Sequence, residues 1–149
     1  MSNPAFKTLL SPTRIGKLEL KNRMVVTDMG ANFAEPDGSA SDRIIAYHEE
    51  QARGGAGLII TGATGVALPV GRVQGWQVGI SEDRMIPGLL RLTEAVHRHG
   101  AKIAAQLHHG GLVAGDSARD GLPLWAPAVP SPVKDADFLS FFLESELAK

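Results

Sequence analysis

The sequence predicts an α/β protein in which parallel strands alternate with helices. Three apolar runs, at residues 24–29, 57–61 and 102–107, are separated by two segments with helical periodicity. The run at 57–61 is apolar without alternation, which is typical of a parallel strand buried on both faces. A β-α-β-α-β order with short joins indicates parallel strands connected by crossover helices.

Turn and capping residues place the other elements. A short hairpin is expected within residues 9–23, where Gly16 lies between two apolar stretches. Ser41 or Asp42 can cap a first helix, which Gly54 ends. The second helix is expected from about residue 86 to residue 99, where leucines recur at the helical period.

The remainder of the chain is less regular. Residues 108–134 are rich in glycine and proline and are expected to form a long loop. The tail at 135–149 can form a terminal helix, although its phenylalanines and leucines need a surface to bury against.

Composition limits the classes of function. The formal net charge is −1, which gives no whole-chain attraction to nucleic acid or to an anionic membrane. The chain has no cysteine, which excludes disulfides and thiolate chemistry within it and fits a reducing cytosol. No apolar run approaches the roughly 18 residues of a membrane span. We therefore expect a cytoplasmic protein that binds neither nucleic acid nor membrane.

One motif suggests a different α/β fold. Leu-Ile-Ile-Thr-Gly-Ala-Thr-Gly-Val at residues 58–66 resembles the nucleotide-binding turn of short-chain dehydrogenases. That turn needs a third glycine and then a helix whose N-terminus holds the pyrophosphate. Here Leu68 occupies the third position, and Pro69 follows where the helix should begin. An NAD(P)-binding domain is therefore the weaker alternative.

Three segments in register carry a stronger resemblance. They are Gly-Lys-Leu-Glu-Leu-Lys-Asn-Arg at 16–23 with the strand after it, Ala-Arg-Gly-Gly-Ala-Gly-Leu-Ile-Ile at 52–60, and Lys-Ile-Ala-Ala-Gln-Leu-His-His-Gly at 102–110. Together they resemble the Old Yellow Enzyme, or NADH:flavin oxidoreductase, family, including its 2,4-dienoyl-CoA reductase-like branch. The resemblance implies an N-terminal fragment, with about three βα units, of a (β/α)₈ TIM barrel. The 149 residues are expected to form one partial FMN-binding domain, 1–149, well short of the roughly 250 residues of a complete barrel.

Candidate cofactor-binding residues lie at the carboxyl ends of the expected strands, where barrel enzymes bind ligands. A flat flavin needs small residues for close approach, and Gly30 and Ala63 provide them. The Gln106 amide offers both donors and an acceptor to a pyrimidine edge. By resemblance, Asp28, Met29 and Gly30 would lie along FMN near its reactive N5 side, with Ala63 near a carbonyl edge. Many relatives have Thr or Cys in place of Gly30 and Pro in place of Asp28, so substrate preference does not transfer.

The resemblance also implies the chemistry of a longer parent protein. NAD(P)H would reduce FMN, and flavin N5 would pass a hydride to an activated C=C bond of an enone, enoate or dienoyl-CoA type. In the family, a His pair or His-Asn pair that binds the substrate, the Tyr acid and the phosphate site belong to later strands, which we do not find in this sequence, so we assign no catalytic residue to it. A 4Fe–4S cluster and FAD would belong only to a missing C-terminal part. No metal is expected, because the spacing of four histidines does not suit a metal site. These are His97, His99, His108 and His109.

Two accounts of the short chain remain open. It is either an inactive fragment of an FMN oxidoreductase or a non-catalytic half-barrel that assembles with itself or with a separate other half. A homo-oligomer of the full-length parent is also compatible with the sequence. We expect the isolated 149-residue chain not to bind FMN tightly, because it would supply only one side of the flavin site.

Overall fold

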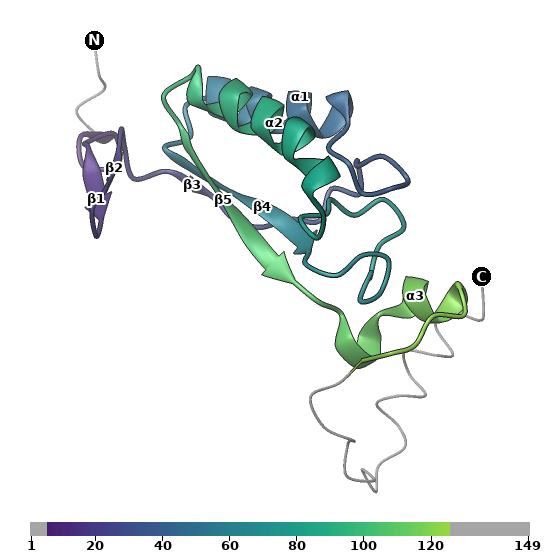
Figure 1. Cartoon of the computed structure of the whole chain (residues 1–149). Coiled ribbons are helices and arrows are strands. Elements are labelled where there is room, and N and C mark those ends of the chain that lie inside the picture. The colour runs from purple at the N-terminus through teal and green to yellow at the C-terminus, as the bar shows by residue number, and fades with distance from the viewer. Residues whose placement is uncertain (1–5, 126–149) are drawn as a thin grey trace, which may run out of the picture.

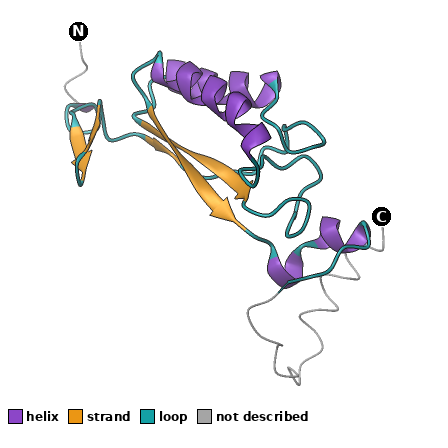
Figure 2. Ribbon diagram, in the orientation of Figure 1, coloured by secondary structure: helices purple, strands orange, loops and turns teal. Residues whose placement is uncertain are grey.

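The computed structural model describes residues 6–125 and has two parts in sequence order: a small hairpin and a layered βα unit. Figure 1 shows two helices, α1 and α2, lying side by side over one face of a sheet formed by β3, β4 and β5. The hairpin stands apart from this layer at the N-terminal end of the described chain. Figure 2 shows the same two-layer arrangement by element type.

The hairpin forms within the expected segment. β1, Thr13–Ile15, pairs antiparallel with β2, Leu18–Leu20. Gly16 occupies the turn with φ +57°, a left-handed conformation that glycine adopts without a steric penalty. Asn22 follows β2 and ties this region to the βα unit, because its side-chain amide donates to the Gly55 carbonyl at 2.7 Å.

The sheet has three parallel strands in the order β3-β4-β5. β3, Val25–Val26, is shorter than the run expected at 24–29. β4, Leu58–Gly65, extends four residues beyond the expected end, and β5, Lys102–His108, extends one residue. β3 is short because the chain after Val26 turns towards β4, where the Met29 backbone lies against Gly62.

The two helices begin at recognisable signals. α1, Asp42–Arg53, is capped by Ser41, whose side-chain oxygen accepts a hydrogen bond from the Ile44 backbone N–H at 3.1 Å. A short 3₁₀ turn, η2, Asp83–Met85, leads directly into α2, Ile86–His97. α2 ends two residues before the expected end at 99, because the chain leaves the helix through Gly100, which has φ +70°.

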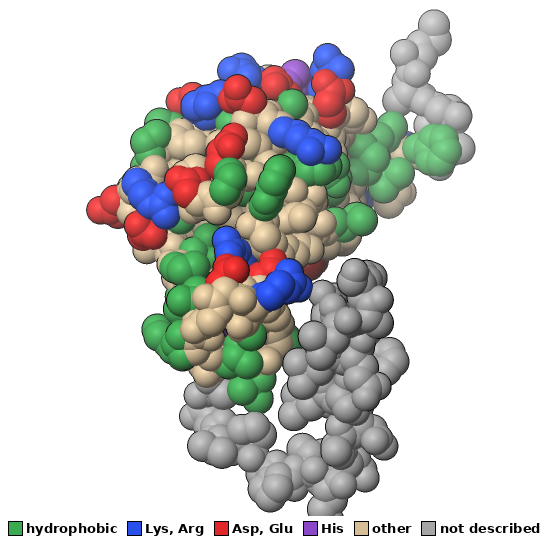
Figure 3. Space-filling model, turned by 90° about the vertical axis from the view of Figure 1, so that its right-hand side faces the viewer, with side chains coloured by type: hydrophobic (Ala, Val, Ile, Leu, Met, Phe, Trp, Pro, Cys, Tyr) green, Lys and Arg blue, Asp and Glu red, His purple; other side chains and the backbone are tan. Residues whose placement is uncertain are grey.

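The core lies between the helices and the sheet. Its largest members are Ile44 from α1, Ile59 from β4, and Leu92 and Val96 from α2, all nearly inaccessible to solvent. Acidic and basic side chains are interspersed over the upper part of the molecule in the view of Figure 3. No residue of β5 is fully buried, and Leu107 on it remains 67% exposed.

The segment expected as one irregular loop at 108–134 contains local structure in its described part. η3, Gly111–Val113, and α3, Gly115–Arg119, follow β5. The buried Ser117 hydroxyl donates to the Pro69 carbonyl at 2.8 Å and so fixes α3 to the loop after β4. Residues 126–134 and the expected terminal helix at 135–149 lie outside the described residues.

The loop after β4 decides against the dinucleotide-binding alternative. That alternative requires a helix immediately after Gly65, but residues 66–82 form turns and bends up to η2. Within residues 6–125, none of the helices has the length and apolar character needed to cross a bilayer.

Candidate functional site

The carboxyl ends of the three parallel strands bring together the residues that the sequence singled out. Gln106 on β5 lies opposite Ala63 on β4 in the strand register. Asp28 follows β3, and its carboxylate Oδ2 accepts a hydrogen bond from the Gln106 Nε2 at 2.5 Å. Because β4 separates β3 from β5, this hydrogen bond crosses over the end of the central strand.

An irregularity in β4 makes that crossing sterically feasible. Thr61 pairs with Ala105 and Ala63 with Gln106, so Gly62 is an extra residue in the ladder, a β-bulge. A Cβ atom at Gly62 would lie 2.3 Å from the Met29 carbonyl oxygen and 2.8 Å from the Gly30 Cα. Only glycine therefore permits the chain after β3 to pack this closely against β4.

Gly30 lies beside a residue that sequence reasoning missed. A Cβ atom at Gly30 would lie 2.6 Å from the Gln74 side-chain nitrogen, so the Gln74 amide occupies the space next to this glycine. Gln74 belongs to the loop after β4, and no motif in that loop signals it. Its position depends on how two loops pack.

Two hydrogen bonds hold those loops together. The Asn32 side-chain oxygen accepts a hydrogen bond from the Trp76 N–H at 2.8 Å, and the Ala34 N–H donates to the Trp76 carbonyl at 3.0 Å. Asn32 has φ +52°, a conformation that asparagine tolerates better than most residues. The segments after β3 and β4 therefore form one connected rim, from which the Trp76 side chain extends into solvent at 52% exposure.

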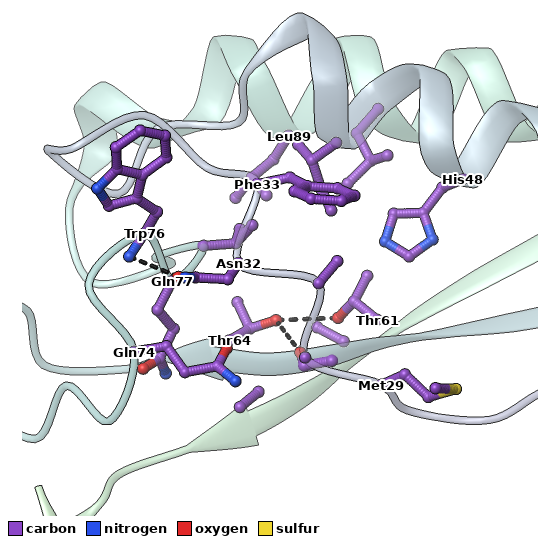
Figure 4. A pocket seen from close by; sticks show the side chains of 18 residues that line it. Met29, Asn32, Phe33, His48, Thr61, Thr64, Gln74, Trp76, Gln77 and Leu89 are labelled. Atoms are coloured by element: carbon purple, nitrogen blue, oxygen red, sulfur yellow. Dashed lines mark hydrogen bonds between the residues drawn. The ribbon is translucent and has the colours of Figure 1, made fainter. Parts of the chain in front are cut away.

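A small cavity lies on the helix side of this rim. Its volume is about 40 Å³, and Figure 4 shows Thr61, Thr64, His48 and Met29 around it. The Thr61 and Thr64 hydroxyls are 2.9 Å apart and hydrogen bonded. The cavity has room for ordered water but is far smaller than the several hundred Å³ of a typical cofactor pocket. Three of the five candidate residues, Met29, Gly30 and Ala63, line this cavity, whereas Asp28 and Gln106 do not. The candidate ligand surface is therefore the open surface at the strand ends where Asp28, Ala63 and Gln106 meet, which we call the ledge.

His48 is the buried titratable group nearest the cavity. Only 3% of its surface is accessible, and its Nδ1 lies 3.0 Å from the Gln51 side-chain oxygen. Burial lowers the pKa of His48 below its ordinary value of 6.5, an effect that the hydrogen bond with Gln51 partly opposes. The neutral imidazole is therefore the form that the fold favours.

His109, which directly follows the carboxyl end of β5, supports the next loop. Its Nδ1 accepts a hydrogen bond from the Gly111 N–H at 3.0 Å, and its ring stacks on Trp125 with a centroid separation of 6.0 Å. The nearby Arg72 guanidinium forms an ion pair with Asp120 at 2.5 Å. Among residues 6–125, no three His, Asp or Glu side chains are grouped as they would be to hold a metal ion.

The chemistry of the ledge suits a planar, hydrogen-bonding ligand. Small residues line its floor, Met29 adds a 65% exposed apolar side chain, and the Gln106 amide projects from its far strand. An amide supplies two donors and an acceptor, which can pair with an imide or lactam edge. The ledge is open on the side away from the helices and would enclose only part of such a ligand.

Comparisons with known proteins identify the family of the chain. The model of the NADH:flavin oxidoreductase / NADH oxidase family matches residues 8–138. An NADH oxidase of Thermoanaerobacter brockii is 42% identical over 128 residues, covering 86% of this chain and 19% of that protein. A metal reductase of Desulforamulus reducens is 44% identical over 126 residues, and the match covers 85% of this chain and 18% of the reductase.

A solved structure extends the comparison to the fold. The Old Yellow Enzyme from Pichia sp. AKU4542 superposes with a TM-score of 0.73 and 32% identity, covering 83% of this chain and 32% of that chain. The chain therefore has the fold of the N-terminal part of an Old Yellow Enzyme-type (β/α)₈ barrel, and spans less than a third of the length of this neighbour. On the family match and this fold, the chain belongs to the NADH:flavin oxidoreductase / NADH oxidase family.

Proposed function

We propose that this chain is the N-terminal part of an FMN-dependent NAD(P)H oxidoreductase and forms one side of its flavin site. The observation that carries the proposal is the convergence of Asp28, Ala63 and Gln106 at the ends of three neighbouring parallel strands. Barrel enzymes bind their ligands at this end of the strands. Family membership supports FMN as the ligand.

The residues present fit part of the isoalloxazine ring. Gln106 would hydrogen bond the pyrimidine, while Ala63 would allow the ring to approach the backbone closely. Gly30 would do the same once the Gln74 amide beside it swings away. The exposed Met29 side chain would cover apolar ring surface and exclude water from it. Asp28 would lie beside the pyrimidine through its hydrogen bond with Gln106.

Bound FMN would supply hydride transfer from NAD(P)H to a small-molecule substrate. Enones, enoates and dienoyl-CoA thioesters are the substrate class we propose, because the activated C=C bond of each accepts a hydride at its β-carbon. This chain contributes binding and orientation, and the proton donor and phosphate site would belong to the rest of the barrel. The described residues therefore act on the cofactor rather than on the substrate.

Flavin titration tests the proposal. The protein expressed from its complete open reading frame should bind FMN with quenched flavin fluorescence, and Gln106→Leu should weaken binding by roughly tenfold, since hydrogen bonds in a buried site contribute about 1–2 kcal/mol. Lys102→Leu is the matched control, because Lys102 lies at the opposite end of the same strand. Equal affinity in the wild type and Gln106→Leu would remove Gln106 from the site.

The exposed edge of the sheet favours a second, compatible proposal about assembly. β5 is an edge strand among the described residues, and Leu107 on it is 67% exposed. Unpaired strand edges promote association. The 149-residue chain alone should therefore associate, and it should bind FMN only weakly because it supplies only one side of the flavin site. Light scattering distinguishes the two accounts of the chain. A polydisperse aggregate supports an inactive fragment, whereas a defined dimer supports a half-barrel that assembles. Submicromolar FMN binding by a monomer would contradict both.

A further inference from the structure

The hydrogen bond between Asp28 and Gln106 determines which way the Gln106 side-chain amide is turned. A carboxylate oxygen only accepts hydrogen bonds, so the Gln106 atom that faces Asp28 must be the amide nitrogen. The carbonyl oxygen of the same planar amide then points away from Asp28. Oxygen and nitrogen of a free glutamine amide can exchange places by rotation, and the carboxylate removes that ambiguity.

The amide orientation also determines which hydrogen-bonding groups of Gln106 remain for a ligand. One Nε2 hydrogen is committed to Asp28, which leaves one N–H donor and the Oε1 acceptor for a ligand. A donor beside an acceptor complements an imide edge, which presents an N–H beside a carbonyl. With the orientation that Asp28 imposes, the free N–H donor and the Oε1 acceptor of Gln106 both remain available on the side away from Asp28.

The hydrogen bond between Asp28 and Gln106 depends on the tertiary fold. Asp28 and Gln106 are 78 residues apart in the chain and extend from strands that are not adjacent in the sheet. They meet beyond a stretch of β4 where Gly62 lets the chain after β3 pack closely and where Ala63 pairs with Gln106. Among residues 6–125, no Lys or Arg side chain is hydrogen bonded or ion paired to Asp28, and its carboxylate contacts Gln106.

We propose that Asp28 is a positioning residue that locks the Gln106 amide in the orientation required to bind the imide edge of the flavin. This inference rests on the proposed function, because it takes FMN as the ligand of the ledge. It assigns to Asp28 an effect on cofactor affinity that operates through Gln106.

Two measurements on the protein from the complete open reading frame test the role of Asp28. The first follows the Gln106 side-chain amide by ¹⁵N NMR without FMN, with the signal assigned by its loss in Gln106→Met. Asp28→Ala should shift this amide signal, because the charged acceptor is removed. The second is FMN titration, in which Asp28→Ala should weaken binding by roughly two- to tenfold, the equivalent of one net hydrogen bond.

Two further variants separate positioning from charge. Asp42→Ala removes the same charge from the exposed start of α1 and should leave both readouts unchanged. Asp28→Asn retains an acceptor oxygen but can also donate, so it should restore only part of the affinity lost in Asp28→Ala.

The outcomes distinguish this inference from the proposed function. If the wild type binds FMN but Asp28→Ala binds it equally or more tightly, the positioning role is wrong and the flavin assignment stands. An unmoved Gln106 amide signal in Asp28→Ala would also overturn the positioning role. If the wild type fails to bind FMN at all, the proposed function fails and this inference fails with it.

Discussion

Gly62→Ala is the substitution for which the structure makes the sharpest prediction. The added methyl group would lie 2.3 Å from the Met29 carbonyl oxygen, whereas ordinary van der Waals contact begins at 3.4 Å. The atoms it meets are backbone, so the segment after β3 must move by about 1 Å rather than a side chain rotating away. Overpacking of this kind costs about 1–3 kcal/mol.

The cost translates into measurable changes in stability and binding. In the protein from the complete open reading frame, with a barrel domain of roughly 250 residues, 1 kcal/mol lowers the melting temperature by about 2–4 °C, so we expect a decrease of roughly 2–12 °C by calorimetry or circular dichroism. FMN affinity should also fall, because Met29 and Asp28 would move with the displaced segment. Displacements of about 1 Å are enough to disable precisely positioned sites.

Gly115→Ala provides the control. Gly115 begins α3, and a Cβ atom there meets nothing within 4 Å. This variant should melt within about 1–2 °C of the wild type, since substitutions without new contacts stay within roughly 0.5 kcal/mol. If Gly62→Ala matched Gly115→Ala in both stability and FMN affinity, the close packing of the β3 segment against the bulge would not be needed for either.

Three further predictions concern other parts of the chain. Ser41→Ala should lower the free energy of unfolding by about 0.5–2 kcal/mol in urea denaturation, because the Ile44 N–H loses its cap, and an unchanged midpoint would contradict the capping role. Burial lowers the folded-state pKa of His48 below 6.5. The stability that the neutral His48 contributes is therefore complete above pH 6.5 and is lost as the pH falls towards the folded-state pKa. His48→Gln should flatten this part of the curve of stability against pH. Gly30→Thr should fold, because the neighbouring Gln74 amide can swing away, and flavin titration and potentiometry should then show an altered FMN affinity or potential; loss of folding would refute the assumed mobility of Gln74.

The sequence contained enough local information to place the helices and strands. Ser41 and Gly54 mark the ends of α1, and the unalternating apolar run at 57–61 marks β4 as a buried parallel strand. The same logic located Ala63 and Gln106 at strand ends, where the register now places them opposite each other. The roles of these residues towards FMN remain proposals.

The parts that were not predicted depend on register and loop packing. The bulge at Gly62 shifts the pairing of β4 with β5, and no spacing rule indicates where such an extra residue falls. The Asp28–Gln106 hydrogen bond joins residues on non-adjacent strands, so it follows from that shifted register. Gln74 approaches Gly30 through a loop whose path no motif describes.

The central claim is that three neighbouring strand ends form one side of a flavin site. A crystal structure of the protein from its complete open reading frame, grown with FMN, tests it most directly. The account predicts the pyrimidine hydrogen bonded to the Gln106 amide, with Ala63 and Met29 against the ring and Asp28 retaining its hydrogen bond with Gln106. A flavin bound elsewhere, with Gln106 turned away from it, would contradict the account.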